Sequence, residues 1–421
     1  MTWYERVCRR WGFGAYLSTQ FLGAFNDNLS KLLVICFGTG VLGSSTPRGS
    51  TFMTLAAAGF ILPYLLFSSV AGYLADRFSK RTVMIWTKFA EIIIMSVGFW
   101  LACRHALYGL LIVLFAMGSQ SAFFSPAKYG FLPETRSGSL SRANGLTQLF
   151  TFLAIIIGGW AGGMISDFFG NQPAGGFAFC ILFAAAGTLT SLFITPTSPG
   201  NPRAVFRLED PFTPHWHTLR EMAHDRLLLT AILGNTYFWF LGTVFQLILV
   251  VLVQNTLHGS SAMVGNLQGA IALGIGLGCV CAGLLSRSHA TCRFVVPAAV
   301  AMTVAALLLA ALGRFAAPVF ALTVILGICA GFYQLPLSTA IQQRAPAAER
   351  GRYIGASNAL DCLSMLAGSA FLWCMQTILH FGARAIIAAV GLLTAIAALI
   401  LHHCLRQPVP PSPSPTTGNT P

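Results

Sequence analysis

Long apolar runs separated by short, basic connections dominate this chain. A run of about 20 apolar residues is the length that an α-helix needs to cross the hydrocarbon core of a bilayer. The pattern therefore predicts an all-α polytopic membrane protein whose twelve transmembrane helices form two six-helix halves. We expect these helices at 13–40, 52–75, 82–102, 107–130, 143–167, 175–195, 227–256, 263–286, 294–312, 317–342, 352–379 and 384–404.

The composition agrees with a membrane protein. Of the 421 residues, 55% are hydrophobic and only 9% are charged, whereas a soluble domain carries roughly 25% charged residues. The first apolar run contains Asp27 and is followed by no small-residue cleavage site, so we expect it to be a membrane helix, not a signal peptide. The eleven cysteines are scattered and suggest neither a disulfide framework nor a zinc finger.

A proline-rich polar connection divides the chain. We expect an N-terminal half at 1–195, a central loop at 196–226, a C-terminal half at 227–404 and a disordered Pro/Ser-rich tail at 405–421. The central loop contains His215, Trp216 and His217, which we interpret as part of an interfacial loop. Two histidines are too few ligands for a metal site, and the sequence suggests no metal and no cofactor.

The basic residues predict the orientation, because Lys and Arg gather in cytoplasmic connections. Eighteen of them fall on one side of the predicted topology and four on the other. The first side, which holds both termini, is therefore expected to face the cytoplasm. The net charge of +13 does not indicate nucleic-acid binding, since the basic residues form no continuous face. The larger group comprises Arg6, Arg9, Arg10, Arg77, Lys80, Arg81, Arg136, Arg142, Arg203, Arg207, Arg220, Arg226, Arg287, Arg293, Arg344, Arg350, Arg352 and Arg406; the smaller comprises Arg48, Arg104, Arg314 and Arg384.

The two halves resemble each other in sequence. FLGAFNDNLSKLLVICFGTG, beginning at Phe21, aligns with FLGTVFQLILVVLVQNTLHG, beginning at Phe240. A second pair of segments follows at nearly the same offset. Tandem repeats of this kind are typical of transporters in which one half rocks against the other around a site near the membrane midplane. The second pair matches Pro126 with Pro336 and Asn144 with Asn358.

The most unusual stretch is FLGAFNDNLSK, which places Asn26, Asp27, Asn28 and Lys31 inside a predicted membrane helix. An ionisable residue at this depth costs about 2.5–3.5 kcal/mol on insertion scales and normally faces a protein interior or a water-filled path. Asp27 and Lys31 are one helical turn apart, so they can partly neutralise each other. Two interpretations stay open: a polar cluster that helps the helices pack, and a substrate or coupling-ion site.

Other charged residues have competing interpretations. Lys128, near the end of the fourth helix, could hold a phosphate group or snorkel to the interface. Lys88 and Glu91 share a helix face and can neutralise each other, and Glu134 is expected to pair with a local Lys or Arg. No catalytic arrangement is evident, and Asp361 has no obvious catalytic partner, so we do not expect an enzyme.

The connection GYLADRFSKR, from Gly72 to Arg81, resembles the loop signature of the major facilitator superfamily, G-x-L-a-D-R/K-x-G-R/K-R/K. Ser79 stands where that family has glycine, which puts the tightness of the turn in question. Gly72 would allow two helices to approach closely, and Asp76 could pair with a basic group or a helix N-terminus in the other half. The segment therefore predicts a cytoplasmic gate formed by Gly72, Asp76, Arg77, Lys80 and Arg81. The matching connection of the second half, Gly283 to Arg293, lacks the acid.

Three segments narrow the resemblance. FLGAFNDNLSK, SPAKYGFLPE and ANGL are similar to the bacterial lysophospholipid transporter family, some of whose members are fused to acyltransferase domains. The resemblance implies a major facilitator fold in the cell inner membrane and inward flipping of a lysophospholipid, chiefly lysophosphatidylethanolamine, by alternating access. Nothing in the sequence demands more than a monomer. It also implies reacylation by a cytoplasmic acyltransferase.

A mostly apolar cavity agrees with such a substrate, because a sugar would need many polar partners. Two alternatives stay open. One is efflux of drugs or other amphiphiles, and the other is a non-transporting membrane subunit of a lipid-acylating system.

Overall fold

The structure is a computed structural model that describes residues 3–42, 47–134, 139–170, 172–203, 213–259, 261–286 and 292–406. This part of the chain is helical and contains no β-strand. Twelve long α-helices are present in it. They are α1 (Trp3–Leu42), α2 (Pro47–Arg77), α3 (Lys80–Cys103), α4 (Leu107–Phe131), α5 (Leu140–Phe169), α6 (Pro173–Ser191), α8 (Arg226–Asn255), α9 (Ser261–Leu285), α10 (Val295–Leu312), α11 (Ala316–Arg344), α12 (Arg350–Trp373) and α13 (Ala383–Arg406).

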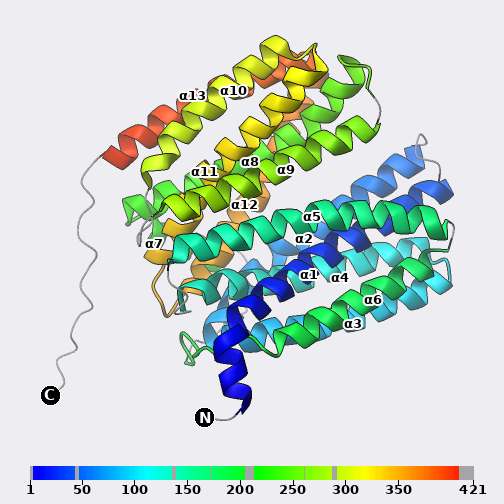
Figure 1. The fold of residues 1–421 in the computed structure, drawn as a ribbon, viewed down its shortest axis with the longest axis vertical. Coiled ribbons are helices and arrows are strands. Elements are labelled where there is room, and N and C mark those ends of the chain that lie inside the picture. The colour runs from blue at the N-terminus through cyan, green and yellow to red at the C-terminus, as the bar shows by residue number, and fades with distance from the viewer. Residues whose placement is uncertain are drawn as a thin grey trace.

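The helices form two bundles, α1–α6 and α8–α13 (Figure 1). In the first bundle, α1 packs on α5 and α6, α2 on α4, and α3 on α4 and α6. In the second bundle, α8 packs on α12 and α13, α9 on α11, and α10 on α11 and α13. The pairing order is therefore the same in both bundles, as expected for a tandem repeat of one six-helix unit.

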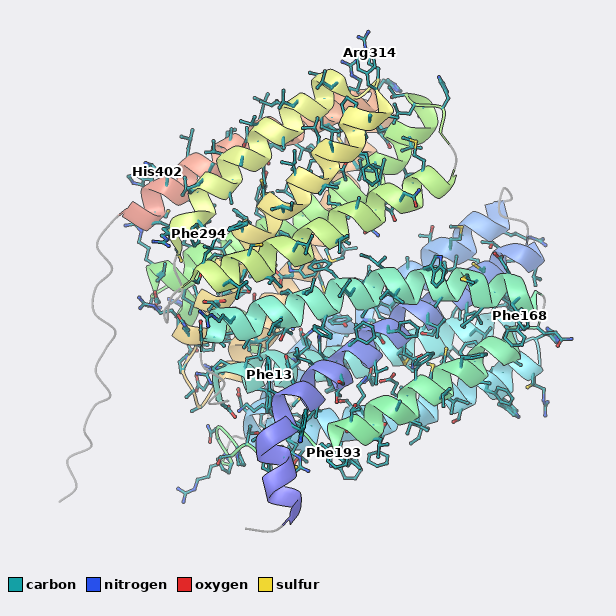
Figure 2. The ribbon with its side chains drawn as sticks, viewed as in Figure 1. Phe13, Phe168, Phe193, Phe294, Arg314 and His402 are labelled. Atoms are coloured by element: carbon teal, nitrogen blue, oxygen red, sulfur yellow. The ribbon has the colours of Figure 1, made fainter. Side chains whose placement is uncertain are left out.

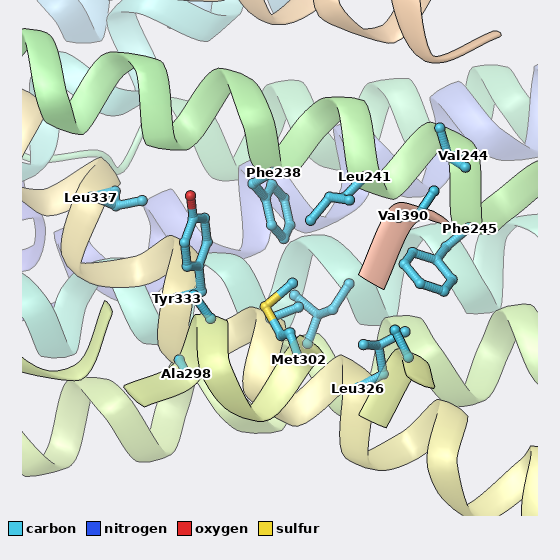
Figure 3. Close-up of a cluster of buried hydrophobic side chains, with 14 of the residues drawn as sticks. Phe238, Leu241, Val244, Phe245, Ala298, Met302, Leu326, Tyr333, Leu337 and Val390 are labelled. Carbon is cyan, nitrogen blue, oxygen red and sulfur yellow. The ribbon is translucent and has the colours of Figure 1, made fainter. Parts of the chain in front are cut away.

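Apolar side chains occupy both the inside and the outside of the molecule. Within the second bundle, Phe238, Leu241, Met302 and Leu326 form a buried cluster with Tyr333 (Figure 3). Outward-facing apolar side chains are frequent, and they include Trp86, Ile112 and Leu399. A soluble surface rarely exposes apolar residues so extensively, whereas a surface in contact with lipid does.

Eleven of the long helices in the described part are apolar enough to cross a membrane. The exception is α1, which has 40 residues and is therefore long enough. Its charged first turns and the polar residues of FNDNLSK lower its hydropathy. This helix nevertheless packs inside the first bundle with the others, so the twelve-helix architecture is confirmed.

The two bundles contact each other along α2–α12 and α5–α9. Gly72 and Gly283 lie where these helices approach each other closely. A Cβ atom on Gly72 would lie 2.6 Å from the carbonyl oxygen of Gly351, and one on Gly283 would lie 2.8 Å from that of Ser141. Both contacts are at the end of the molecule that carries α7 (Thr213–Met222). The ribbons diverge toward the opposite end, which carries Phe168 and Arg314 (Figures 1 and 2).

Three details differ from the expected elements. The helix α1 begins at Trp3, ten residues before the predicted start, because charged residues continue the helix beyond its apolar part. The α-helical part of α12 ends at Trp373 and continues as a single π-helical turn, Cys374–Ile378. The predicted disordered tail is not one of these details, because residues 407–421 lie outside the described residues.

The third difference is α7 itself. The prediction that His215, Trp216 and His217 lie in an interfacial loop is wrong, because they belong to this short helix. Pro214 stands in the first turn of α7, where a missing backbone N–H has no cost. That position is the sequence signal for the helix.

Candidate functional site

Asp27 lies in the middle of α1, with its side chain directed toward α4. Its Oδ2 accepts a hydrogen bond of 2.8 Å from the hydroxyl of Ser121. Its Oδ1 is buried and has no hydrogen-bond partner among the described residues. A buried acceptor without a partner is costly, so this oxygen is available to a ligand that can donate.

Lys31, one turn along α1, forms no ion pair with Asp27 in the part of the chain that the structure describes. Its Nζ instead donates to Oδ1 of Asn28 at 3.3 Å and lies 5.5 Å from the ring centre of Phe60. The amide of Asn28 donates to the carbonyl oxygen of Ala24. The carboxylate and the ammonium group therefore interact only at longer range, and each keeps hydrogen-bonding capacity.

Asn26 belongs to a different contact. Successive residues of a helix are about 100° apart, and the Asn26 amide points to α3, where it donates to Oε1 of Glu91 at 2.7 Å. Oε2 of Glu91 pairs with Lys88 at 2.5 Å, which confirms the predicted pair. All three side chains are buried inside the first bundle. The structure thus separates Asn26 from Asp27, Asn28 and Lys31.

Lys128 lies in the last turn of α4 and is half-buried. Its Nζ is 3.5 Å from the hydroxyl of Thr151 on α5 and 4.8 Å from the ring centre of Tyr129. The Thr151 hydroxyl in turn donates to Oε1 of Gln20 at 2.9 Å. Lys128 also interacts electrostatically with Asp27, so the two predicted site residues belong to one charged region.

We refer to Asp27, Lys31, Ser121 and Lys128 as the Asp27 site. It offers one unpartnered carboxylate oxygen and two ammonium groups that form no ion pair among the described residues. Phe60 lies beside Lys31, and Phe67 stacks on Phe123 at 5.8 Å within α2 and α4. The arrangement can bind a group that carries both charges and is attached to an apolar chain. Sequence reasoning did not identify Ser121.

Asp76, at the end of α2, contacts the other half directly. Its Oδ1 accepts from the backbone N–H of Gly351 at 2.6 Å, and its Oδ2 accepts from that of Arg352 at 2.8 Å. Both groups are in the first turn of α12, where N–H groups have no partner within the helix and the helix dipole favours an anion. This is the contact with a helix N-terminus that the sequence predicts for Asp76.

Of the other residues of the predicted gate, one contacts the second half and three contact their own half. Gly72 contacts α12, as described above, and Lys80 pairs with Glu134 at 2.8 Å, as predicted for Glu134. Glu134 is also 4.0 Å from Arg350 of α12. Arg77 donates to Tyr73 of its own helix, and Arg81 donates to the carbonyl oxygen of Leu192 in its own half.

The turn between α2 and α3 is tight although it lacks the glycine of the family signature. Only Phe78 and Ser79 separate the two helices. Ser79 adopts φ −57° and ψ 132°, which any L-residue reaches without strain. Its hydroxyl bonds to that of Thr197 at 3.1 Å, so serine fits this position.

Sequence reasoning missed several contacts that join the halves. The Asn144 and Gln342 side-chain amides exchange hydrogen bonds of 3.1 and 3.0 Å between α5 and α11. Asn358, the repeat partner of Asn144, donates to Ser125 of α4 at 2.9 Å. The two asparagines thus cross the interface in opposite directions. Two further ion pairs, which join the second half to the central segment, are Arg352 with Glu221 of α7 and Arg344 with Asp225.

The described residues contain no group of three His, Cys, Asp or Glu side chains that could hold a metal ion. The groups near Asp27 are its carboxylate, the ammonium groups of Lys31 and Lys128, and the hydroxyl group of Ser121.

Comparisons with known proteins show the family of this chain. The chain is 28% identical over 393 residues to the lysophospholipid transporter LplT of Enterobacter sp. (strain 638), covering 92% of this chain and 93% of that protein. It is 27% identical over 364 residues to LplT of Escherichia coli (strain SE11), covering 86% of each chain.

Among solved structures, the human organic anion transporter MFSD10 superposes with a TM-score of 0.76 at 16% identity, covering 92% of this chain and 99% of that one. The transporter FucP in its outward conformation gives 0.71 at 13% identity, covering 93% and 98%. The sequence profile described as Major Facilitator Superfamily matches residues 13–369 and 244–420. The chain is a multi-pass membrane protein that belongs to the Major Facilitator Superfamily.

Proposed function

We propose that this protein transports a lysophospholipid across the membrane by alternating access. The observation that carries the proposal is the Asp27 site, where an unpartnered carboxylate oxygen and two lysines without an ion pair adjoin aromatic side chains. The similarity to proteins named lysophospholipid transporter supports the same substrate class. Transport leaves the lipid chemically unchanged, so the protein is not an enzyme.

The headgroup chemistry fits the site. The ammonium group of lysophosphatidylethanolamine, which we propose as the principal substrate, can donate to Oδ1 of Asp27. Its phosphate can accept from Lys31 or Lys128. Such charge-assisted contacts are the strong ones in a site of low dielectric constant. The acyl chain would lie along apolar and aromatic side chains such as Phe67 and Phe123.

The orientation follows from the basic residues. We propose that the end with α7 and both termini faces the cytoplasm of a cell inner membrane. In that orientation Asp76 holds α12 on the cytoplasmic side, and the bundles diverge toward the other side (Figure 1). Opening of the α2–α12 contact would then release the lipid inward, where a cytoplasmic acyltransferase could reacylate it.

Labelled lysophosphatidylethanolamine in proteoliposomes tests the proposal. The purified protein should speed movement of the lipid between leaflets, and liposomes without protein should not. Lysophosphatidic acid, which lacks the ammonium group, is the matched control and should move more slowly. Equal rates for both lipids would contradict recognition by Asp27, and absence of lipid movement together with export of cationic amphiphiles would favour the efflux alternative.

A further inference from the structure

The second half contains its own buried acid, which the proposed transport mechanism does not use. Asp361 lies on α12 and is only 8% exposed. Its Oδ2 accepts from the amide of Asn235 at 2.9 Å, and its Oδ1 accepts from the hydroxyl of Thr236 at 3.2 Å. Both partners belong to α8 and are neutral. They donate hydrogen bonds to the Asp361 carboxylate but supply no positive charge.

No Lys or Arg forms an ion pair with Asp361 within the part of the chain that the structure describes. The neighbouring titratable groups are Tyr129 on α4 and Cys362 on α12, with Tyr64 on α2 interacting with Cys362. The facing residues of α8 and α11 are amides, hydroxyls and apolar side chains. Burying a carboxylate without a counter-charge is very costly. The folded protein therefore has to take up a positive charge from the solution.

A cavity of about 60 Å³ adjoins the carboxylate. It is large enough for a few water molecules or one small ion with part of its hydration. Asn235, Trp239, Gln334, Asn358 and Asp361 line it from the second half, and Tyr129 lines it from the first. The cavity therefore lies where the two bundles meet.

A second observation points to a ligand. Asn235 is 5% exposed, and its Oδ1 is buried and has no hydrogen-bond partner among the residues that the structure describes. This oxygen belongs to the same side chain whose amide holds Asp361. An unsatisfied buried acceptor costs about 1–3 kcal/mol, and small hard cations prefer oxygen ligands of this kind.

The similarity between the two halves does not explain why residue 361 is acidic. Asp361 follows Asn358 by three residues, and the residue three positions after the matching Asn144 is Thr147. The Thr147 hydroxyl donates to the carbonyl oxygen of Ala143 within its own helix. The six-helix unit therefore folds with a neutral residue at this position, and packing gives no reason for a charge.

We infer that Asp361, Asn235 and Thr236 form a binding site for an exchangeable monovalent cation, either a proton or an alkali-metal ion. The site is separate from the Asp27 site. Asp27 has Glu91 as an acidic electrostatic neighbour and Lys31, Lys88 and Lys128 as basic ones, so basic side chains of the protein balance the acidic ones around it. Asp361 has no basic neighbour of this kind among the described residues and requires the cation. Because the cavity is shared by both bundles, occupancy of the site would be coupled to their relative position.

The test uses the purified protein and no lipid substrate, so it does not depend on the proposed function. The melting temperature is measured in detergent while N-methylglucamine chloride is replaced by NaCl, LiCl or KCl at constant ionic strength, at acidic and at alkaline pH. An alkali ion bound to the folded state would raise the melting temperature by a few degrees as its concentration passes the Kd. If the cation is a proton, raising the pH leaves the carboxylate uncompensated and lowers the melting temperature, with no alkali-ion effect.

Asp361→Asn should abolish whichever response the parent shows, whereas Asp27→Asn, the matched acid control, should keep it. Asn235→Ala removes one oxygen and keeps the acid, so it should shift the concentration or pH of half-maximal response. If Asp361→Asn does not fold, the shift measured for Asn235→Ala still tests the inference. A parent protein without either response would overturn the inference, and so would responses that persist in Asp361→Asn or stay unshifted in Asn235→Ala.

Discussion

Neighbouring polar residues on α1 contact different helices, because a helix turns about 100° per residue. Asn26 joins the buried pair of Lys88 and Glu91 in the interior of the first bundle. Asp27 faces Ser121 on α4 and keeps one oxygen without a partner. The packing interpretation of the FNDNLSK stretch therefore suits Asn26, and the binding interpretation suits Asp27.

Asp27→Asn should abolish or strongly reduce lysophospholipid transport. The variant keeps the size of the side chain and removes the charge that we propose for the ammonium group. Loss of a charge-assisted contact costs about 1.5–3 kcal/mol, so affinity should fall roughly tenfold to a hundredfold. Lys31→Met should do less damage, because Lys128 can still donate to the phosphate. Lipid uptake and melting temperature are measured together, and normal uptake by Asp27→Asn would remove this residue from the centre of the site.

Lys88→Met should destabilise the protein more than any change in the Asp27 site. It leaves the Glu91 carboxylate buried without its cation, which typically costs about 3–5 kcal/mol. The double variant Lys88→Met, Glu91→Gln should recover most of that loss, because a neutral amide can still accept from Asn26. Thermal unfolding of the parent, the two single variants Lys88→Met and Glu91→Gln, and the double variant gives the coupling energy. Equal melting temperatures for the single and double variants would show that the ion pair is not a stability determinant.

The sequence predicts which residues are unusual better than it predicts their partners. Asp27 stands out because it is charged within an apolar run, and helical periodicity alone separates it from Asn26. Ser121, Thr151 and Asn235 carry no such signal. Their contacts depend on how α4, α5 and α8 pack on other helices, and short polar side chains are common in membrane helices with no special role.

Among the elements, the apolar helices could be located from hydropathy, whereas α7 and the first turns of α1 could not. Both are polar segments outside the apolar runs, and their helical structure comes from local propensity and contacts. Thr218 in α7 is buried, and Glu221 pairs with Arg352. The contact of α2 with the other half was predictable in kind, because Gly72 and Asp76 stand in the last turns of α2, directly before a turn of only two residues.

Asp76→Asn should slow transport and leave the amount of protein in the membrane nearly unchanged. The carboxylate accepts from two N–H groups of α12, and an amide can accept only one of these bonds while its NH₂ group faces the other N–H. The variant weakens one conformational state without opening a cavity in a bundle. Arg77→Gln, whose described contact is within α2, is the matched control. Parent-like transport by Asp76→Asn would show that the loop acts only as a topological signal.

At the scale of the molecule, the orientation of the two bundles can be tested directly. Tags inserted at Gly200 and after Pro408 should be accessible only from the cytoplasm, and a tag at Gly259 only from outside. The reason is the excess of basic residues at the end that carries α7. Accessibility in intact and permeabilised cells gives the result. The reversed pattern would invert the assignment of the closed side, and a mixed pattern would contradict the assignment of the membrane helices.

Alternating access requires the interface at the α7 end to separate in every transport cycle. The Asn144 and Gln342 amides exchange two hydrogen bonds there, so this pair reports closure. Asn144→Cys combined with Gln342→Cys, in a background whose eleven native cysteines are replaced, should be joined by a short thiol-specific cross-linker. Joining them should stop transport, and cleavage of the linker by a reductant should restore it.

The single cysteine variants, treated in the same way, are the controls and should keep their activity. If the cross-linked protein transported lipid at the parent rate, the two bundles would not need to separate at this end. Rocking about the Asp27 site would then be excluded as the transport mechanism.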